Sequence, residues 1–213
     1  MKVVIFGATG FSGKAILREA LAQNHQVTVL VRNAKAVFVQ DKNLTVVEGN
    51  VLDRNAVNAI LKNQEAVIQC LGVGGKGDGK PTTFVSEANN IIMEEMAKTN
   101  VRRLIAMSIA GAGNSLAFTP WIFRKLVLPY FMKWLQVLID DKNRMEPMII
   151  KSNLDWTIVR CAGILDKAAK GKVNDTLTGK GLKFSITLTD MAKFMVAQLE
   201  EKKYIKQAPS ISN

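Results

Sequence analysis

The sequence is poor in the residue types on which several kinds of chemistry depend. It has one histidine, His25, and two cysteines, Cys70 and Cys161, among 213 residues. His25 lies in a polar stretch between two regular elements, so we expect neither a histidine-based metal site nor Ser-His-Asp catalysis. The cysteines lie far apart in apolar stretches without a Cys-x-x-Cys motif, so we expect both to be reduced and structural. No metal site is predicted.

Long hydrophobic runs are also missing. The apolar stretch after Lys2 ends at Gly7, which is too short for a signal peptide or a membrane span. Residues 116–139 are apolar and rich in aromatic side chains, but they contain Arg124, Lys125 and Lys133 and two prolines. We therefore expect a soluble cytoplasmic protein without stable membrane insertion.

Acidic residues are fewer than basic ones, and the formal net charge is +11. Such a charge suits a polyanionic partner, which could be a nucleic acid or a cofactor that carries several phosphates. The lysines are scattered over the second half of the chain rather than gathered on one helix or interleaved with aromatics. A phosphate-bearing cofactor is therefore favoured, and no nucleic-acid partner is predicted.

Apolar runs of strand length alternate with amphipathic helical segments along the whole chain. This alternation predicts an α/β fold of the Rossmann type, a doubly wound parallel sheet with helices on both faces, as a single domain over residues 1–213. The strands are predicted at residues 3–6, 27–31, 45–47, 66–71, 104–108 and 156–160. The helices are predicted at about residues 11–23, 54–63, 83–99, 141–152 and 189–200.

Two segments interrupt the alternation, and loops at the carboxyl ends of parallel strands line the ligand crevice of such folds. Residues 72–81 are glycine-rich and suit either a mobile substrate-side loop or a plain long connection. Residues 116–139 suit a hydrophobic lid over the substrate, a subunit contact or a shallow membrane-surface patch. Ordinary core packing is a further alternative for this aromatic segment.

A glycine-rich loop follows the first predicted strand and opens the first predicted helix. Glycines at positions 7, 10 and 13 allow a tight turn, a close approach of phosphates and close helix packing, while two hydroxyl residues can donate to phosphate oxygens. The residues expected to bind the dinucleotide phosphates are Gly7, Thr9, Gly10, Phe11, Ser12 and Gly13. A nucleoside-triphosphatase loop is excluded, because Ala8 and Ala15 occupy its glycine and hydroxyl positions.

The tip of the second predicted strand decides which dinucleotide is bound. An acidic side chain there accepts from the ribose 2′-hydroxyl of NAD(H), whereas an arginine pairs with the 2′-phosphate of NADP(H). This chain has Arg32, and the next acidic residue in the sequence is Asp41. We therefore predict NADP(H), with a solvated surface arginine as the alternative.

Several short motifs together resemble the NAD(P)H-binding atypical short-chain dehydrogenases/reductases, which are NmrA-like proteins. The chain looks most like their flavin reductase/biliverdin-IXβ reductase branch. The motifs are Gly-Ala-Thr-Gly at 7–10, Val-Leu-Val-Arg at 29–32, Gly-Asn-Val-Leu at 49–52, Leu-Gly at 71–72, Pro-Thr-Thr at 81–83 and Trp-Thr-Ile-Val-Arg at 156–160.

The resemblance implies where the rest of the cofactor lies. It places Asn50 and Val51 at the adenine. It implies that the ribose and nicotinamide are lined by Leu71, Gly72, Val73, Ser108, Ala162 and Gly163. Relatives more often have proline where this chain has Cys161.

The Tyr-x-x-x-Lys acid of standard short-chain dehydrogenases is missing. Lys142 resembles the lysine of that motif, but the residue four positions before it is Leu138. Tyr130 lacks a lysine at the required spacing, and Tyr204 lies in what we expect to be a charged tail. Carbonyl reduction with a tyrosine acid is therefore not expected.

These features leave two hypotheses. The first is an NADPH-dependent reductase that passes hydride to a flat conjugated small molecule, such as a flavin or quinone, with Ser108 and Lys142 orienting the cofactor. A surface pair between Lys142 and Glu146 is the alternative reading of that lysine. The second hypothesis is a non-catalytic regulatory protein that senses NADP(H). Either protein could be a monomer or a homodimer.

Overall fold

The computed structural model describes residues 1–73, 80–118, 130 and 133–213, in which strands and helices alternate. The strands are β1 (Lys2–Phe6), β2 (Gln26–Val31), β3 (Leu44–Glu48), β4 (Ala66–Gln69), β5 (Arg103–Ile109), β6 (Asp155–Cys161), β7 (Gly163–Leu165), β8 (Asn174–Thr176), β9 (Ser185–Thr187) and β10 (Ser210–Ser212). The helices are α1 (Phe11–Ala22), α2 (Arg54–Leu61), α3 (Phe84–Lys98), α4 (Lys133–Ile150) and α5 (Leu188–Ala197). Short 3-10 turns, η1 (Ala34–Ala36) and η2 (Gly113–Phe118), lie in two of the loops.

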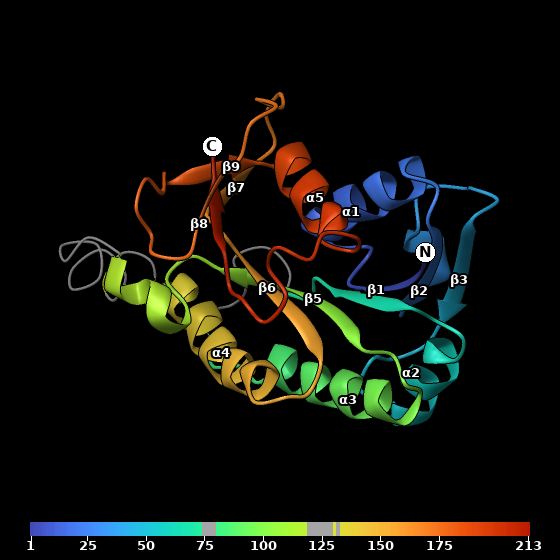
Figure 1. Cartoon of the computed structure of the whole chain (residues 1–213). Helices are drawn as coiled ribbons and strands as arrows, with labels where there is room; N and C mark the ends of the chain where they lie inside the picture. The colour runs from blue at the N-terminus through green and yellow to red at the C-terminus, as the bar shows by residue number, and fades with distance from the viewer. Residues whose placement is uncertain (74–79, 119–129, 131–132) are drawn as a thin grey trace.

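Eight of these strands form one sheet in the order β3-β2-β1-β4-β5-β6-β10-β8. Every neighbouring pair is parallel except β10 and β8, which run antiparallel. The strand order reverses between β1 and β4, which is where ligands bind in open α/β sheets. The parallel pair β7 and β9 forms a separate small sheet above the main one (Figure 1).

Helices cover both faces of the large sheet, with α1 and α5 on one side and α2, α3 and α4 on the other (Figure 1). The sequence of β1 explains why. Val3 and Ile5 pack into the core under α1 and α5, whereas Val4 and Phe6 pack into the opposite core, and all four are fully buried. A strand segment that is buried on both faces must be apolar at successive positions, as Val3 to Phe6 are.

The predicted fold class is confirmed, and each of the six predicted strands and five predicted helices is present with ends shifted by a few residues. The start of α4 is the largest error, because the helix begins at Lys133 rather than 141. Strands β7 to β10 were not predicted, since each has only three residues. Residues 74–79, 119–129 and 131–132 lie outside the described residues, so most of both loop segments that interrupt the alternation lies there too.

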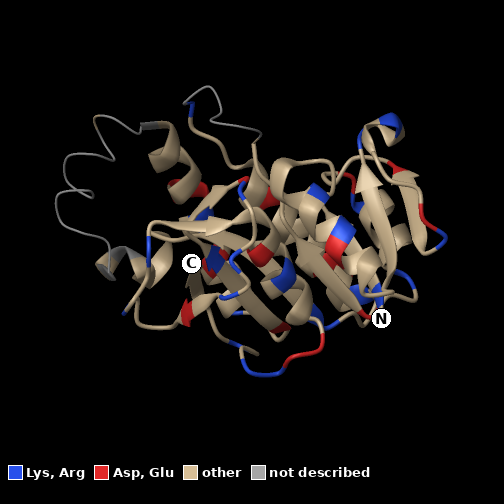
Figure 2. Ribbon diagram, turned by 90° about the horizontal axis from the view of Figure 1, so that it is seen from above, with Lys and Arg blue, Asp and Glu red and all other residues tan. Residues whose placement is uncertain are grey.

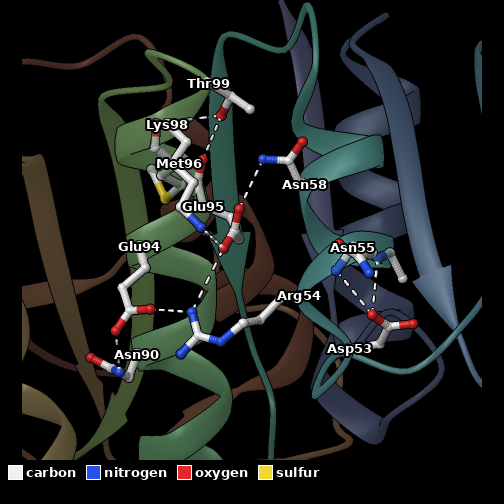
Figure 3. A network of polar contacts seen from close by, with 11 residues as sticks. Asp53, Arg54, Asn55, Asn58, Asn90, Glu94, Glu95, Met96, Lys98 and Thr99 are labelled. Carbon is white, nitrogen blue, oxygen red and sulfur yellow. Dashed lines mark hydrogen bonds and ion pairs between the residues drawn. The ribbon is translucent and has the colours of Figure 1, made fainter.

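A polar seam joins α2 to α3 on the side of the sheet near β3. The buried carboxylate of Glu95 accepts hydrogen bonds from Asn58 Nδ2 at 2.8 Å and Lys98 Nζ at 2.6 Å, and Arg54 pairs with the neighbouring Glu94 (Figure 3). The hydrogen bond from Lys98 is the main reason that the pKa of Glu95 is lowered. Asp53 caps the start of α2, where its carboxylate accepts from the amides of Asn55 and Ala56. Elsewhere, basic and acidic positions are spread over many elements (Figure 2).

A second polar cluster surrounds Asp190 at the start of α5. Its carboxylate accepts from Thr187 Oγ1 at 2.6 Å, from Asn213 Nδ2 at 2.6 Å, and from the amides of Lys170 at 2.7 Å and Gly171 at 3.2 Å. Burial alone would raise the pKa of Asp190, but these hydrogen bonds lower it overall. Asp190 therefore ties β9, β10 and the loop before β8 to one helix start.

We expect Asp190→Asn to destabilise the protein by about 1–3 kcal/mol, because the amide cannot accept from four donors at once. The folded-state pKa of Asp190 lies below its unfolded value, so its contribution is present above about pH 4 and is lost as the pH falls through the folded value. Urea unfolding at pH 7 and pH 3 measures this, with Asp166→Asn, an exposed control, alongside. Equal stability of D190N and wild type at pH 7 would contradict the role given to this carboxylate.

Candidate functional site

The turn from β1 into α1 brings three stretches of backbone into very close contact. Gly7 has a φ of 93°, and a Cβ on it would lie 2.8 Å from the carbonyl oxygen of Cys70. A Cβ on Gly13 would overlap the carbonyl oxygen of Gly7. Only glycine fits at either position, so the loop presents bare main chain at the switch point of the sheet.

The start of α1 is left open to an anion. Gly10 precedes the helix and has no side chain with which to cap it, and no acidic residue lies in the first turn. Thr9 and Ser12 are half-buried beside this end, and Phe11 is 55% exposed. The first amides of a helix have no partner within it and carry its positive dipole end, so they suit the pyrophosphate of a dinucleotide.

Arg32 follows directly after β2, next to this loop. Its side chain is exposed, and within the described part of the chain no hydrogen bond or ion pair engages its guanidinium. The loop after it is fastened to α1, where the guanidinium carbon of Arg18 lies 4.4 Å and the ammonium of Lys14 lies 5.5 Å from the centre of the Phe38 ring. Cations stacked on an aromatic ring add to the positive charge at this edge.

Glu48 is a neighbour of this site that the sequence analysis missed. It ends β3 beside Val31, and its carboxylate accepts from the amide of Ala34 at 3.1 Å. The sequence analysis missed Glu48 because it lies 16 residues after Arg32. The register of β2 and β3 nevertheless places the ends of the two strands side by side. The hydrogen bond to Ala34 occupies one of its oxygens.

The remaining predicted cofactor residues lie at the carboxyl ends of the neighbouring strands. Asn50 follows β3 with its side-chain oxygen already accepting from the amide of Leu52 at 3.0 Å, and Val51 is buried beside it. After β4, Gly72 is exposed and has open space where a Cβ would stand. The residues that follow the ends of β4 and β6 are Leu71, Gly72, Val73, Ala162 and Gly163. The fold thus gathers all the predicted cofactor residues along one edge of the sheet.

Lys142 reaches from α4 to this edge. Its ammonium donates to the carbonyl oxygens of Met107 at 2.8 Å and Leu71 at 3.4 Å, so that it bridges the ends of β5 and β4. Burial lowers the pKa of Lys142 to about 8. The surface pair between Lys142 and Glu146 that the sequence allowed does not form within the described structure, because Glu146 is buried and bonded elsewhere.

Ser108 lies at the end of β5, but its hydroxyl does not face an open space. The residue is 2% exposed, and Oγ donates to Glu146 Oε1 at 2.6 Å. Glu146 is also paired with Arg160, whose Nη2 lies 2.6 Å from Oε2. The sequence analysis missed this network. The signal that could have revealed it is Arg160 itself, a charge at an inward position of a strand that is otherwise apolar.

The two cysteines are free and buried. Cys70 Sγ donates to the carbonyl oxygen of Phe6 at 3.1 Å, and burial raises the pKa of both thiols to about 12. Lys142 lies close enough to both thiols to lower these values slightly. The expectation of reduced, structural cysteines agrees with this arrangement.

Neither tyrosine supplies an acid at the edge of the sheet. Tyr130 is 76% exposed, and Tyr204 is buried with its hydroxyl on the carboxylate of Asp175 in β8. The expectation that Tyr204 lies in a charged tail was wrong, because the last residues return to the sheet as β10. Among the described residues, no cluster of histidine, cysteine and acidic side chains could hold a metal ion, and no helix is long and apolar enough to cross a bilayer.

Comparisons with known proteins agree with this geometry. The chain is similar to the uncharacterised protein YwnB of Bacillus subtilis, at 27% identity over 212 residues that cover 96% of this chain and 94% of YwnB. It is also 27% identical to the photosystem II assembly factor Ycf39 of Synechocystis over 166 residues, which cover 78% of this chain but only 45% of that longer protein.

Three solved structures share the fold. The oxidoreductase ylbE from Lactococcus lactis has a TM-score of 0.82 at 21% identity, covering 100% of this chain and 91% of that one. The anaerobillin reductase ChuY from Escherichia coli O157:H7 has a TM-score of 0.78 at 22% identity, covering 100% and 97%. A short-chain dehydrogenase/reductase from Veillonella parvula in complex with NADP has a TM-score of 0.76 at 17% identity, covering 100% and 94%.

A family model described as NAD(P)H-binding matches residues 7–202, which run from the glycine loop to beyond the end of α5. That match includes every predicted cofactor residue, and the fold and the strand-edge site fit it. The chain therefore belongs to the NAD(P)H-binding family, and its fold is of the Rossmann type.

Proposed function

We propose that this protein is an NADPH-dependent reductase that transfers hydride to a flat conjugated acceptor, such as a flavin or a quinone. The observation that carries this proposal is that two candidate hydroxyl donors are already engaged in hydrogen bonds. The hydroxyl of Ser108 donates to Glu146, and the hydroxyl of Tyr204 donates to Asp175. Because these two hydroxyls are engaged within the described structure, we infer hydride transfer to an acceptor that takes its proton from water.

The cofactor is bound through main chain and one guanidinium. The pyrophosphate lies at the start of α1 over Gly7 to Gly13, and Arg32 pairs with the 2′-phosphate. The adenine lies against Asn50 and Val51, and the nicotinamide lies over the ends of β4, β5 and β6. The NADP that accompanies the Veillonella structure supports this choice of cofactor. The bound nicotinamide supplies the hydride.

Lys142 orients the cofactor at the crevice. Its ammonium is fixed by two backbone carbonyls, which hold it near the strand ends where the ribose and nicotinamide would lie. Ser108 contributes to this orientation through its position near the end of β5, where the nicotinamide would lie. The sequence resemblance to the flavin reductase/biliverdin-IXβ reductase branch and the description of ChuY as a reductase support a reductase here.

The surroundings of the site complete the proposal. The aromatic segment 116–139, which the sequence analysis offered as a lid over the acceptor, lies mostly outside the described residues. The protein acts in the cytoplasm as a monomer or homodimer on a small molecule, without a nucleic-acid partner or membrane insertion. A protein that only senses NADP(H) is the second candidate, and the missing tyrosine acid suits it as well.

The acceptor reaction separates these two candidates. We expect purified protein to oxidise NADPH, followed at 340 nm, in the presence of a flavin or quinone and not in their absence. Calorimetric titration with NADPH provides the reference for binding. Tight NADPH binding without reduction of any conjugated acceptor would contradict the reductase and favour the sensing protein. The absence of affinity for NADPH and NADH would contradict both candidates.

Arg32→Ala should weaken NADPH binding about 10- to 100-fold, the effect of losing a charge-assisted hydrogen bond, and leave NADH binding within about twofold. Titration of both dinucleotides measures this selectivity. Lys62→Ala, which removes an exposed cation after α2, is the matched control and should change neither affinity. Equal losses for NADPH and NADH in R32A would disprove pairing with the 2′-phosphate.

Activity should fall as the pH rises through about 8, because the buried ammonium of Lys142 loses its proton there. Lys142→Met should be slow at all pH values and lack this high-pH limb, whereas Lys142→Arg should keep its charge and move the limb upward. Profiles of kcat/KM against pH measure both. Lys193→Met, on the exposed side of α5, serves as the control. A limb that persists unchanged in K142M would rule out Lys142 as its cause.

A further inference from the structure

A buried ion pair lies beside the crevice, between α4 and β6. The side chains of Glu146 and Arg160 are 1% and 4% exposed, and two of the guanidinium nitrogens bond to the carboxylate, at 2.6 Å and 3.1 Å. Removing two charges from water costs free energy that a single pair seldom recovers, so such a pair is weak evidence for stability. Its better-attested use is to specify one arrangement of the groups around it.

The groups that this pair fixes belong to the loop after β5. The third guanidinium nitrogen of Arg160 donates to Asn114 Oδ1 at 2.6 Å. Gly113 has a φ of 56°, and its Cα lies against the pair so closely that a Cβ would overlap both Glu146 Oε2 and Arg160 Nη2. The loop therefore rests directly on the two charged groups.

The same loop has few other attachments to the body of the protein. The amide of Gly113 donates to Asn143 Oδ1 at 2.8 Å, at an exposed position on α4. The amide of Gly111 donates to Ser115 Oγ at 2.9 Å, which is a bond within the loop itself. Gly111, Ala112 and Ser115 are themselves buried, and the ion pair is the buried polar group on which Gly113 and Asn114 rest.

The position of this loop gives the anchor a role in the reaction. The loop begins at Gly111, just after the carboxyl end of β5. It is therefore four residues beyond Met107, whose carbonyl oxygen accepts from Lys142. Loops at the carboxyl ends of parallel strands form the substrate side of such sites. The loop also leads into the aromatic segment 116–139.

We propose that Glu146 and Arg160 are positioning residues that hold the loop of residues 111–115 against the acceptor side of the site and thereby determine how well the acceptor is bound. This inference rests on the proposed function. Ser108 belongs to the same network, because its hydroxyl donates a third hydrogen bond to the Glu146 carboxylate. None of the three needs to touch the substrate to act in this way.

The test uses substitutions in the loop, because an unpaired buried charge in E146Q or R160M would endanger folding. Asn114→Ala removes the bond to Arg160 while leaving the ion pair intact. Gly113→Ala pushes the loop away from the pair. Asn153→Ala is the matched control, since it is an exposed asparagine just before β6, at the opposite end of that strand.

Two readouts keep the inference separate from the proposed function. Hydrogen–deuterium exchange of the peptide that covers residues 110–118 reports the loop position without any turnover. We expect N114A and G113A to exchange at least about 10-fold faster there than wild type or N153A, because a bond to a charged group has been lost. Unchanged exchange in both variants would overturn the positioning role, whether or not the protein is a reductase.

The kinetic readout tests what the loop position is for. In N114A and G113A, kcat/KM for the acceptor should fall about 10- to 100-fold through KM, since small misplacements at a site cost that much. The Kd for NADPH should match that of N153A in both variants, and in N114A the melting temperature should match it too. Faster exchange with an unchanged KM would overturn the role in acceptor binding. If the wild-type protein reduces no acceptor, the proposed function fails, and with it the acceptor role of this loop, while the exchange result still decides the anchoring.

Discussion

The close approach of three backbone segments at the end of β1 is the constraint on which the rest of the site depends. Gly7, Gly13 and the carbonyl of Cys70 leave no room for a side chain between the first strand, the first helix and β4. This contact fixes the open end of α1 over the switch point of the sheet. Everything that a dinucleotide would touch is placed relative to that turn, since the strand ends β2 to β6 are in register with β1.

The charged groups of the molecule divide into two kinds. Glu95, Asp190, Glu146 and Arg160 are buried, and each forms hydrogen bonds to at least one other element of the fold. Such groups connect elements and are not free to meet a ligand. Arg32 and the first amides of α1, by contrast, lie at the surface without partners in the described structure. Charged or polar groups that lack a partner in the described structure therefore indicate the position of the site better than the net charge does.

The sequence was sufficient for the parts of the structure that depend on local pattern. Continuous apolar strands such as residues 27–31 predicted the sheet, and the glycine spacing at 7, 10 and 13 predicted the tight turn between β1 and α1. The failures share one physical cause, because they depend on contacts between distant residues. Glu146 pairs with Arg160 rather than with the lysine one helical turn away, and Tyr204 is buried where its ring meets Phe194 of α5 and its hydroxyl meets Asp175 of β8.

The two buried thiols have a consequence for a protein that handles conjugated molecules. Quinones and similar compounds are electrophiles that add covalently to thiolates, and the thiolate is the nucleophilic form of cysteine. Cys70 and Cys161 lie at the ends of β4 and β6, beside the strand ends where an acceptor would bind, yet their pKa values of about 12 keep them protonated near neutral pH. If the acceptor is such an electrophile, as we propose, the protonated thiols would resist alkylation by it.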